Sequence, residues 1–328
     1  MNKICFGCGS KLQSEDATKE GYIPDAKLKT EDYCQRCFKI IHYGMQSKSS
    51  TPKESNIILR SINKDNKFVI FMANFLTINS EVINIFNQIT NDKILLISKC
   101  DIFLKSIKEI HIKTFLRNYY QIKSDIKLVS SVNNYGVESL TNYLRNRNIH
   151  DVYIVGLSNS GKSTLINKLI DLNQSNMKMI TTSCIPNTTL DFIRIKINDN
   201  LTVIDSPGFI INTIQDDIIT SKNNFKVFLK PKTFQIKVGE TLEIENMYFN
   251  FSEDTSVTLY LINNLKVKKY YKEIDFDNSI VVNNNIDLII SGLGFINIKN
   301  RCMIKTANIK PNLLETRISV FGEYYEQD

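Results

Sequence analysis

The stretch YIVGLSNSGKSTLINKL, residues 153–169, contains residue types and a spacing suited to phosphate chemistry. Gly156, Gly161, Lys162 and Ser163 match the phosphate-loop pattern G-x-x-x-x-G-K-S. The glycines let backbone amides approach a β-phosphate, while the lysine reaches the β- and γ-oxygens and the serine hydroxyl ligates Mg²⁺. A strand is expected before the loop and a helix after it, whose N-terminus adds positive charge. The predicted nucleotide ligands here are Gly156, Asn159, Ser160, Gly161, Lys162, Ser163 and Thr164.

A second motif downstream could complete the metal site. Asp205 and Gly208, in DSPG, follow a predicted strand; the aspartate would hold Mg²⁺ through water and the glycine amide would sense the γ-phosphate. Between the two motifs, PNTTLD (186–191) offers Thr188 or Thr189 as a further Mg²⁺ ligand, and we favour Thr189. Taken alone, PNTTLD is equally compatible with a plain loop. The predicted catalytic set is Lys162, Thr189, Asp205 and Gly208.

The residues that could read a base lie upstream of the phosphate loop. Ser98-Lys99-Cys100-Asp101 ends one predicted buried strand, and Ser130-Ser131 ends the next. GTPases carry NKxD and SA-x at such positions. Asp101 would accept hydrogen bonds from guanine N1–H and the exocyclic amine, the stem of Lys99 would lie along the base, and a backbone amide of the serine pair would donate to O6. Adenine would place an acceptor opposite the carboxylate, which disfavours it strongly.

The motif order is therefore base reader, base clamp, phosphate loop and two switch-like segments, which is a circular permutation of the usual order. A predicted helix over 137–147 joins the original termini, and this is physically inexpensive because domain termini often lie close together. Strand–helix alternation over 67–169 predicts an α/β fold, a parallel sheet with helices on both faces. We expect a hairpin over 192–206 and an antiparallel β-rich region from about residue 222.

Four cysteines are spaced as a structural zinc site. Cys5, Cys8, Cys34 and Cys37 form two C-x-x-C pairs, which together complete a tetrahedron. The polar segment between the pairs cannot build a core, so the metal must hold it. Chance pairing and a redox motif are the alternatives, but a redox motif does not need a second pair. We assign this closed site no catalysis and expect His42 to pack or cap; the remaining cysteines, expected to be ordinary residues, are Cys100, Cys184 and Cys302.

Charge and hydropathy limit the function classes. The net charge is +7, and residues 1–150 carry 22 Lys and Arg against 14 Asp and Glu. This excess favours a polyanionic partner such as RNA, although the Asn/Ile/Lys-rich composition could equally reflect an A+T-rich genome. No apolar run approaches the length of a membrane span, and MNKICFGCGS lacks the apolar core of a signal peptide. We therefore expect a cytoplasmic protein.

Taken together, these motifs resemble the YqeH-type circularly permuted GTPases. The resemblance covers essentially the whole chain, and the stretches that carry it are CFGCG…CQRCFKIIHYG (5–44), SKCD, GLSNSGKST, PNTTLD, DSPG and DLIISGLGF (287–295). It implies GTP hydrolysis in assembly of the small (30S) ribosomal subunit, with rRNA or ribosomal proteins as partners. The expected domains are a zinc module (1–47), the permuted GTPase domain (56–220) and a β-rich RNA- or ribosome-contacting domain (222–328). We expect a monomer away from the ribosome.

Four positions depart from the family or refine it. Ser98 replaces the usual Asn, which predicts guanine binding weaker by about 1 kcal/mol with selectivity kept by Asp101. Asn187 replaces a glycine and could stiffen its loop. Phe209 stands where many GTPases have a water-orienting Gln, so hydrolysis should be slow without an activator. Asn159 matches an asparagine that helps related GTPases bind K⁺ between the phosphates, making K⁺ a candidate cofactor besides GTP, GDP, Mg²⁺ and Zn²⁺.

Three other functions remain open on the sequence. A general P-loop NTPase or ATPase is supported only by Ser98. A zinc/β RNA-binding protein with a degenerate nucleotide site conflicts with the intact Lys162, Ser163 and Asp205. A signalling GTPase with a protein or membrane partner is disfavoured by the zinc module and by the absence of a lipidation motif. Tyr270 and Tyr271, beside KVKK, either stack on bases or are ordinary half-buried strand residues.

Overall fold

The chain folds into two compact units. One comprises residues 1–74, 84–100 and 124–211, and the other comprises residues 75–83, 101–123 and 212–328. The boundary between them therefore falls directly before Asp101. The computed structural model describes residues 3–5, 11–17, 21–35, 38, 55–102, 108–157, 160–173, 182–184, 192–209, 211, 230–262, 265–271 and 274–321.

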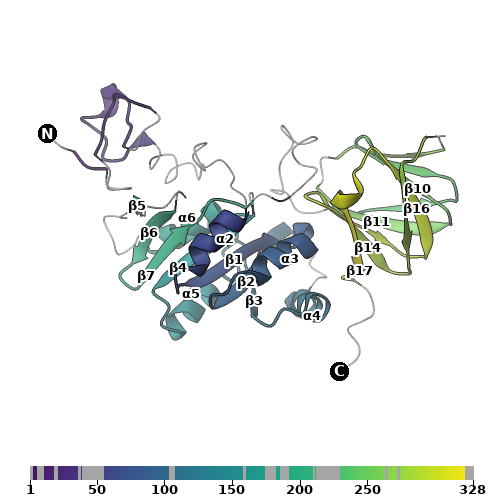
Figure 1. The fold of residues 1–328 in the computed structure, drawn as a ribbon, viewed down its shortest axis with the longest axis horizontal. Helices are drawn as coiled ribbons and strands as arrows, with labels where there is room; N and C mark the ends of the chain where they lie inside the picture. The colour runs from purple at the N-terminus through teal and green to yellow at the C-terminus, as the bar shows by residue number, and fades with distance from the viewer. Residues whose placement is uncertain are drawn as a thin grey trace. The chain divides into compact units, whose positions relative to one another are not determined.

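The first unit is built on a seven-stranded sheet with the strand order β3-β2-β1-β4-β7-β6-β5 (Figure 1). Strands β3, β2, β1, β4 and β7 are parallel to one another, whereas β6 pairs antiparallel with β7 and β5 pairs antiparallel with β6. The strands are β1 (Phe68–Asn74), β2 (Lys93–Ser98), β3 (Asp125–Leu128), β4 (Asp151–Gly156), β5 (Thr182–Cys184), β6 (Ile193–Asn198) and β7 (Leu201–Asp205).

Helices cover both faces of this sheet because its central strands are apolar on both sides. Every residue of β1 is buried. Ile70 and Met72 belong to the cluster packed with α5 and α6, whereas Phe71 on the opposite face meets Phe86 of α3 with ring centroids 5.5 Å apart. A continuous apolar run is what a strand covered on both faces requires. The helices of the described residues are α2 (Ser55–Asn63), α3 (Ser80–Asn87), α5 (Val137–Asn146) and α6 (Lys162–Asn173), and α4 (Glu109–Tyr120), which belongs to the other compact unit.

The second unit contains two five-stranded antiparallel sheets, ordered β12-β9-β10-β16-β13 and β17-β14-β15-β11-β8. Alternate residues of β11, Val257, Leu259 and Leu261, are buried in their common core. This period of two is typical of a sheet with one face in a core. The strands are β8 (Lys232–Ile236), β9 (Thr241–Ile244), β10 (Met247–Phe251), β11 (Thr255–Leu261), β12 (Val267–Tyr270), β13 (Asn278–Val282), β14 (Ile286–Ile290), β15 (Gly294–Ile298), β16 (Cys302–Ala307) and β17 (Leu314–Ile318).

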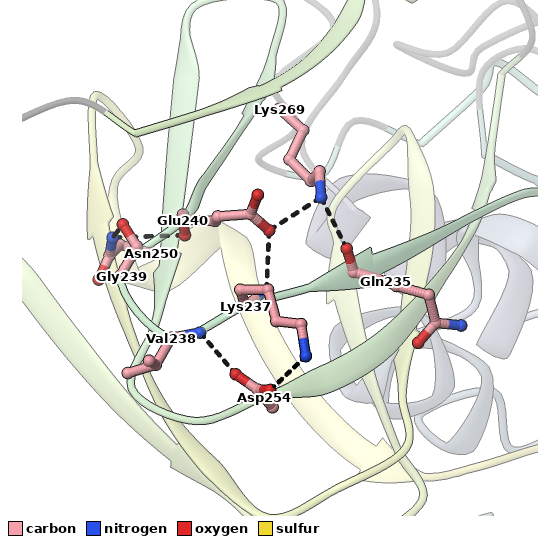
Figure 2. A network of polar contacts seen from close by, with 8 residues as sticks. All are labelled: Gln235, Lys237, Val238, Gly239, Glu240, Asn250, Asp254 and Lys269. Carbon is pink, nitrogen blue, oxygen red and sulfur yellow. Dashed lines mark hydrogen bonds and ion pairs between the residues drawn. The ribbon is translucent and has the colours of Figure 1, made fainter.

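A polar network holds the turn between β8 and β9 and links the two β-rich sheets (Figure 2). Lys237 pairs with Asp254 at 2.7 Å, and Lys269 of β12 pairs with Glu240 at 2.9 Å. Lys269 also donates to the carbonyl oxygen of Gln235 in β8 at 2.8 Å, so one side chain joins a strand of each sheet. Each of these two lysines is thus neutralised by a carboxylate.

The predicted fold class is confirmed: a parallel sheet with helices, a β6–β7 hairpin and a β-rich C-terminal part. Neither α2 nor the short edge strand β5 was predicted from the sequence. The described residues also contain the 3₁₀ turns η1 (Asp25–Lys27), η2 (Phe75–Thr77), η3 (Cys100–Ile102) and η5 (Pro311–Leu313). No helix in the part of the chain that the structure describes is long and apolar enough to cross a bilayer.

Candidate nucleotide site

Five polar or glycine positions end the parallel strands at one edge of the sheet. Asn74, Ser98, Gly156 and Asp205 are the last residues of β1, β2, β4 and β7, and Ser130 lies two residues beyond β3. Strands β1 and β4 are neighbours, although the chain visits β2 and β3 between them. Ligands of open α/β sheets bind outside the carboxyl ends of the strands at such a switch point. Asn74 was not among the predicted ligands, although a polar residue that ends a buried strand was a usable signal.

The phosphate loop joins β4 to α6, as the motif predicts. Gly156 has φ +153°, and a Cβ there would lie 2.1 Å from the carbonyl oxygen of Met72 in the neighbouring strand β1. Gly161 has φ +96°, a backbone conformation that residues with side chains rarely adopt, although a Cβ there would have open space around it. Both positions therefore need glycine for the loop to keep this path. Helix α6 starts at Lys162, so its free N-terminal amides lie at the end of the loop.

Lys162 and Asp205 are two buried ionisable groups that influence each other electrostatically. Lys162 is 2% exposed, and its ammonium donates to the carbonyl oxygens of Gly156 and Leu157, each at 3.1 Å. Burial lowers the pKa of Lys162 to about 8, against the opposing effect of Asp205. Burial likewise raises the pKa of Asp205 to about 6, although Lys162 and a backbone hydrogen bond from Ser206 favour its charged form. Such perturbed groups are typical of a functional site.

Two buried oxygen atoms in this region have no hydrogen-bond partner among the described residues. They are Oδ1 of Asp205 and the Oγ of Ser160, a residue that is 2% exposed. An unpaired buried oxygen is costly, so it marks a place where a ligand would add bonds. A carboxylate oxygen is a preferred Mg²⁺ ligand and a hydroxyl can donate to phosphate. The residues present therefore fit a phosphate group with its metal.

The ends of β2 and β3 are joined by backbone hydrogen bonds. The amide of Val129 donates to Ile97 at 2.8 Å, and the amide of Cys100 donates back to Val129 at 3.2 Å. Lys99, between them, takes φ +59°, a left-handed conformation uncommon for a residue with a side chain. The backbone thus changes direction abruptly where the predicted base reader begins.

Ser98 connects this region to the phosphate loop. Its buried hydroxyl donates to the carbonyl oxygen of Ser160 at 2.6 Å. Ser130 is fully buried, and its hydroxyl accepts the amides of Val132 and Asn133 at 3.3 and 3.4 Å, which shapes the loop after β3. Ser98 therefore links the end of β2, which is predicted to bind the base, to the phosphate loop. Ser130 holds the shape of the loop after β3. Both serines belong to the predicted nucleotide-binding motifs.

For the other predicted ligands in the described residues, the structure gives the element in which each lies and, for some of them, its burial. Asp101 lies in η3 and is half-buried, and Gly208 lies in the loop after β7. Ser131 is half-buried beyond β3. Ser163 and Thr164 lie in the first turn of α6. The predictions for a further set of positions lie outside the described residues: Asn159, Asn187, Thr188, Thr189, Cys8, Cys37 and His42.

Phe209, at the predicted water-orienting position, is part of the core. It is 1% exposed and stacks on Phe71 with ring centroids 5.9 Å apart. Its amide donates to the carbonyl oxygen of Gly156 at 3.0 Å, which fixes the backbone beside the phosphate loop. The side chain therefore packs under the sheet and leaves water positioning to other groups.

The N-terminal cysteines can be followed only in part. Cys5 and Cys34 are each 1% exposed, and the amide of Cys34 donates to Cys5 Sγ at 3.1 Å. They pack with Leu12 and Ile23 in a very small core. Among the described residues, which exclude Cys8 and Cys37, no three His, Cys, Asp or Glu side chains gather as a metal site. An amide directed at a buried sulfur does fit a thiolate that ligates a metal.

Comparison with known proteins finds a family model and relatives that match this α/β region. The family model described as RsgA GTPase matches residues 50–214, which run from before β1 to beyond β7 and so include the motifs in their permuted order. YqeH of Bacillus subtilis (strain 168) is 35% identical over 253 residues, 73% of this chain and 69% of that protein. The chain is a circularly permuted GTPase of the YqeH type. A second family model, described as 50S ribosome-binding GTPase, matches residues 151–284 of this permuted GTPase.

More distant relatives are longer or less alike. Nitric oxide-associated protein 1 of Mus musculus is 23% identical over 253 residues. The matched region is 59% of this chain and 36% of that protein. The crystal structure of YjeQ from Thermotoga maritima is 22% identical with a TM-score of 0.31, over 45% of this chain and 51% of that one.

Proposed function

We propose that this permuted GTPase hydrolyses GTP to GDP and phosphate slowly, and acts as a switch during assembly of the small ribosomal subunit in the cytoplasm. The observation that supports nucleotide hydrolysis best is the pair of unsatisfied buried oxygens, Asp205 Oδ1 and Ser160 Oγ, next to the phosphate-loop lysine. The family assignment supplies guanine nucleotides as the class of ligand.

The chain's own residues would act by binding and charge stabilisation. An incoming phosphate offers Lys162 stronger acceptors than the carbonyl oxygens of Gly156 and Leu157 that it now contacts. The N-terminal amides of α6 would also donate to the same group. Ser163, Thr189 and Asp205 would hold Mg²⁺, which neutralises charge on the phosphates when bound. Because Phe209 is packed in the core, its side chain does not orient water, and hydrolysis by the chain alone stays slow.

K⁺ is the proposed accelerator within the chain's own site. Asn159, in the phosphate loop, is the residue proposed to bind it, and a monovalent cation between the phosphates would neutralise charge as an arginine finger does. This part of the proposal rests on the sequence motif, since Asn159 lies outside the described residues.

A ribosomal partner is proposed from three observations. The resemblance to YqeH-type GTPases implies the small subunit, and residues 1–150 carry an excess of basic residues. The second matching family model carries a description that names the 50S subunit. Cosedimentation of the GTP-bound protein with separate 30S and 50S subunits distinguishes the two, and binding to 50S alone would contradict the small-subunit proposal. We propose that the protein is monomeric when not bound to the ribosome.

The β-rich sheets are the proposed RNA- or ribosome-contacting part, but the turn in Figure 2 is a poor candidate for the contact itself. Lys237 and Lys269 are paired with carboxylates there. Tyr270 is half-buried in β12 and its hydroxyl bonds Glu243, which favours a structural role. Tyr271 is 68% exposed and keeps base stacking open at one position.

A structural zinc ion is the last component of the proposal. Cys5, Cys8, Cys34 and Cys37 would bind it, and the support is the buried Cys5 sulfur that already accepts the Cys34 amide. When bound, zinc supplies the cross-link that a core of this size cannot replace.

The experiment for hydrolysis compares phosphate release from GTP by the full chain and by Lys162→Ala. We expect slow, Mg²⁺-dependent turnover that rises when KCl replaces NaCl, and at least a tenfold loss in Lys162→Ala. GTP turnover unchanged by this substitution would mean that the phosphate loop is not the site. Thermal unfolding of both proteins without nucleotide checks that the variant is folded.

A further inference from the structure

One edge of the β-rich part, strand β13 (Asn278–Val282), has no role in the function described so far. It ends the sheet β12-β9-β10-β16-β13 and pairs with β16 on one side, in an antiparallel register that continues without a shift along the whole strand. No strand of the described residues pairs with its other side. An edge strand presents amide and carbonyl groups that can pair with a further strand.

The hydrogen bonds of β16 show which backbone groups of β13 face the open side. The amide of Ser252, which follows β10, donates to the carbonyl oxygen of Met303 at 2.9 Å, and the amide of Met303 donates back to Ser252 Oγ at 2.9 Å. Both backbone groups of Met303 therefore point toward β10. Because Val281 lies opposite Met303 in the register, its own amide and carbonyl point away from β16. The same holds for Ser279, two residues earlier along the strand.

The side chains of β13 leave this edge accessible. Val281 is 65% exposed, and Ser279 is exposed as well. Within the part of the chain that the structure describes, no group is hydrogen-bonded to the amide or carbonyl of either residue. Ile280, between them, is half-buried and packs against the core shared by the two sheets. A strand added here would meet free hydrogen-bonding groups beside an incompletely covered part of this core.

The other three edges of the two β-rich sheets carry features that block pairing. At β8, Pro231 precedes the strand and the carbonyl oxygen of Gln235 accepts the ammonium of Lys269. Strand β12 itself carries this lysine. At β17, the carbonyl oxygen of Thr316 accepts the hydroxyl of Tyr119 at 3.4 Å. Lysine, proline and covering side chains are the usual protection of an edge, whereas β13, NSIVV, contains no charged residue, no proline and no bulge.

The charges beside β13 indicate the chemistry of a partner. Asp275 and Asp277 directly precede the strand and are exposed, and neither forms an ion pair among the described residues. They outnumber Lys305 of β16, which lies opposite Ser279. Two carboxylates repel the phosphates of RNA and attract a basic peptide. Free backbone amides and carbonyls are matched best by the backbone of another extended chain.

We propose that β13 is a docking edge for an extended, basic segment of a ribosomal protein, which pairs with the backbone of Ser279 and Val281 and adds a strand to the sheet. This inference rests on the proposed ribosomal partner. It assigns one contact of that partner to protein, at an edge where backbone hydrogen bonds supply the affinity and the two aspartates select the charge of the bound segment.

The test compares the full chain, Val281→Pro and Val281→Thr in cosedimentation with purified 30S subunits in the presence of GTP. Proline removes the outward amide and is compatible with an edge strand, because this amide takes no part in the pairing with β16. Threonine keeps the amide and nearly the same side-chain shape. We expect Val281→Pro to bind about fivefold more weakly and Val281→Thr to bind as the unsubstituted chain does.

Three further measurements identify what occupies the edge. Binding to rRNA extracted from the same subunits should be equal for Val281→Pro and the unsubstituted chain, and an equal loss on this RNA would overturn the proposal. The amides of Ser279 and Val281 should gain hydrogen-exchange protection when the unsubstituted chain binds 30S subunits. The double substitution Asp275→Asn and Asp277→Asn should weaken 30S binding more at low salt than at high salt.

Unchanged 30S affinity in a folded Val281→Pro would overturn the docking edge and leave the ribosomal partner standing. An unsubstituted chain that does not bind 30S subunits would instead refute the proposed partner. A concentration-dependent dimer that Val281→Pro abolishes would assign the edge to a second copy of the chain, which also overturns the proposal. If thermal unfolding shows that Val281→Pro is not folded, the exchange measurement on the unsubstituted chain decides.

Discussion

At the scale of single residues, the motif predicts which side chains would meet the phosphates, but it does not predict which hydrogen bonds those side chains make within the protein. Lys162 and Asp205 could be identified from spacing, because few residue types can do their work there. Lys162 also donates to the carbonyl oxygens of Gly156 and Leu157. These two hydrogen bonds depend on the path of the local backbone, which a residue pattern does not predict. The same holds for Ser98: comparison with the usual Asn suggests only that a side chain is shorter, whereas its hydroxyl reaches the Ser160 carbonyl at 2.6 Å.

This hydrogen bond gives a prediction for Ser98→Ala. Because the loss leaves the buried Ser160 carbonyl without that donor, we expect GDP affinity to fall by about 1 kcal/mol, while the ratio of GDP to ADP affinity stays constant. Titration calorimetry with both nucleotides measures it. Ser319→Ala, which removes a buried hydroxyl in the β-rich part, is the matched control and should leave both affinities unchanged. A changed GDP/ADP ratio would mean that Ser98 contacts the base instead.

Phe209 gives a second prediction at this scale. Phe209→Gln replaces a buried, stacked ring with a polar group, so we expect a loss of about 3 kcal/mol in unfolding free energy and no faster GTP hydrolysis. Denaturant unfolding and phosphate release measure the two effects. Phe209→Leu serves as the control for lost volume without added polarity and should be less destabilising. A gain in turnover for Phe209→Gln would show that this side chain can reach the nucleotide.

At the scale of elements, apolar runs and alternation predicted the sheet, its helices and the β6–β7 hairpin correctly, because each pattern is set by which faces are buried. Short or weakly patterned elements were missed: β5 has three residues, and α2 follows a polar stretch that is typical of a linker. No sequence pattern indicated that α4 packs with the β-rich strands, since an amphipathic helix does not name the surface that covers it.

The N-terminal segment gives a prediction at this scale. Its described core has only four buried residues, Cys5, Leu12, Ile23 and Cys34, too few for stability without a cross-link. We expect purified protein to carry one zinc per chain by elemental analysis, and removal of the metal by a chelator to abolish hydrogen-exchange protection over residues 3–38. GDP affinity should not change.

Two variants sharpen the zinc experiment. Cys5→Ser should release the metal, whereas Cys100→Ser, at a cysteine outside the two pairs, should keep it. Full protection of residues 3–38 in metal-free protein would contradict the zinc assignment.

At the scale of the whole molecule, the order of motifs along the chain was the most informative sequence feature. Base reader before phosphate loop predicted the permutation, and the strand order places both motifs at the carboxyl edge of one sheet. How the chain is divided into compact units could not be predicted, because it depends on contacts between residues more than 200 positions apart, such as Arg317 with Ile78 and Glu315 with Ser80.

The central claim is that SKCD, upstream of the phosphate loop, reads guanine. Calorimetric dissociation constants for GDP and ADP test it most directly, on the full zinc-loaded chain, on Asp101→Asn, and on Asp92→Asn as a control at the opposite end of β2. We predict at least a hundredfold preference for GDP that Asp101→Asn abolishes and Asp92→Asn retains. Equal affinity for ADP in the parent chain, or a preference that survives in Asp101→Asn, would contradict the account.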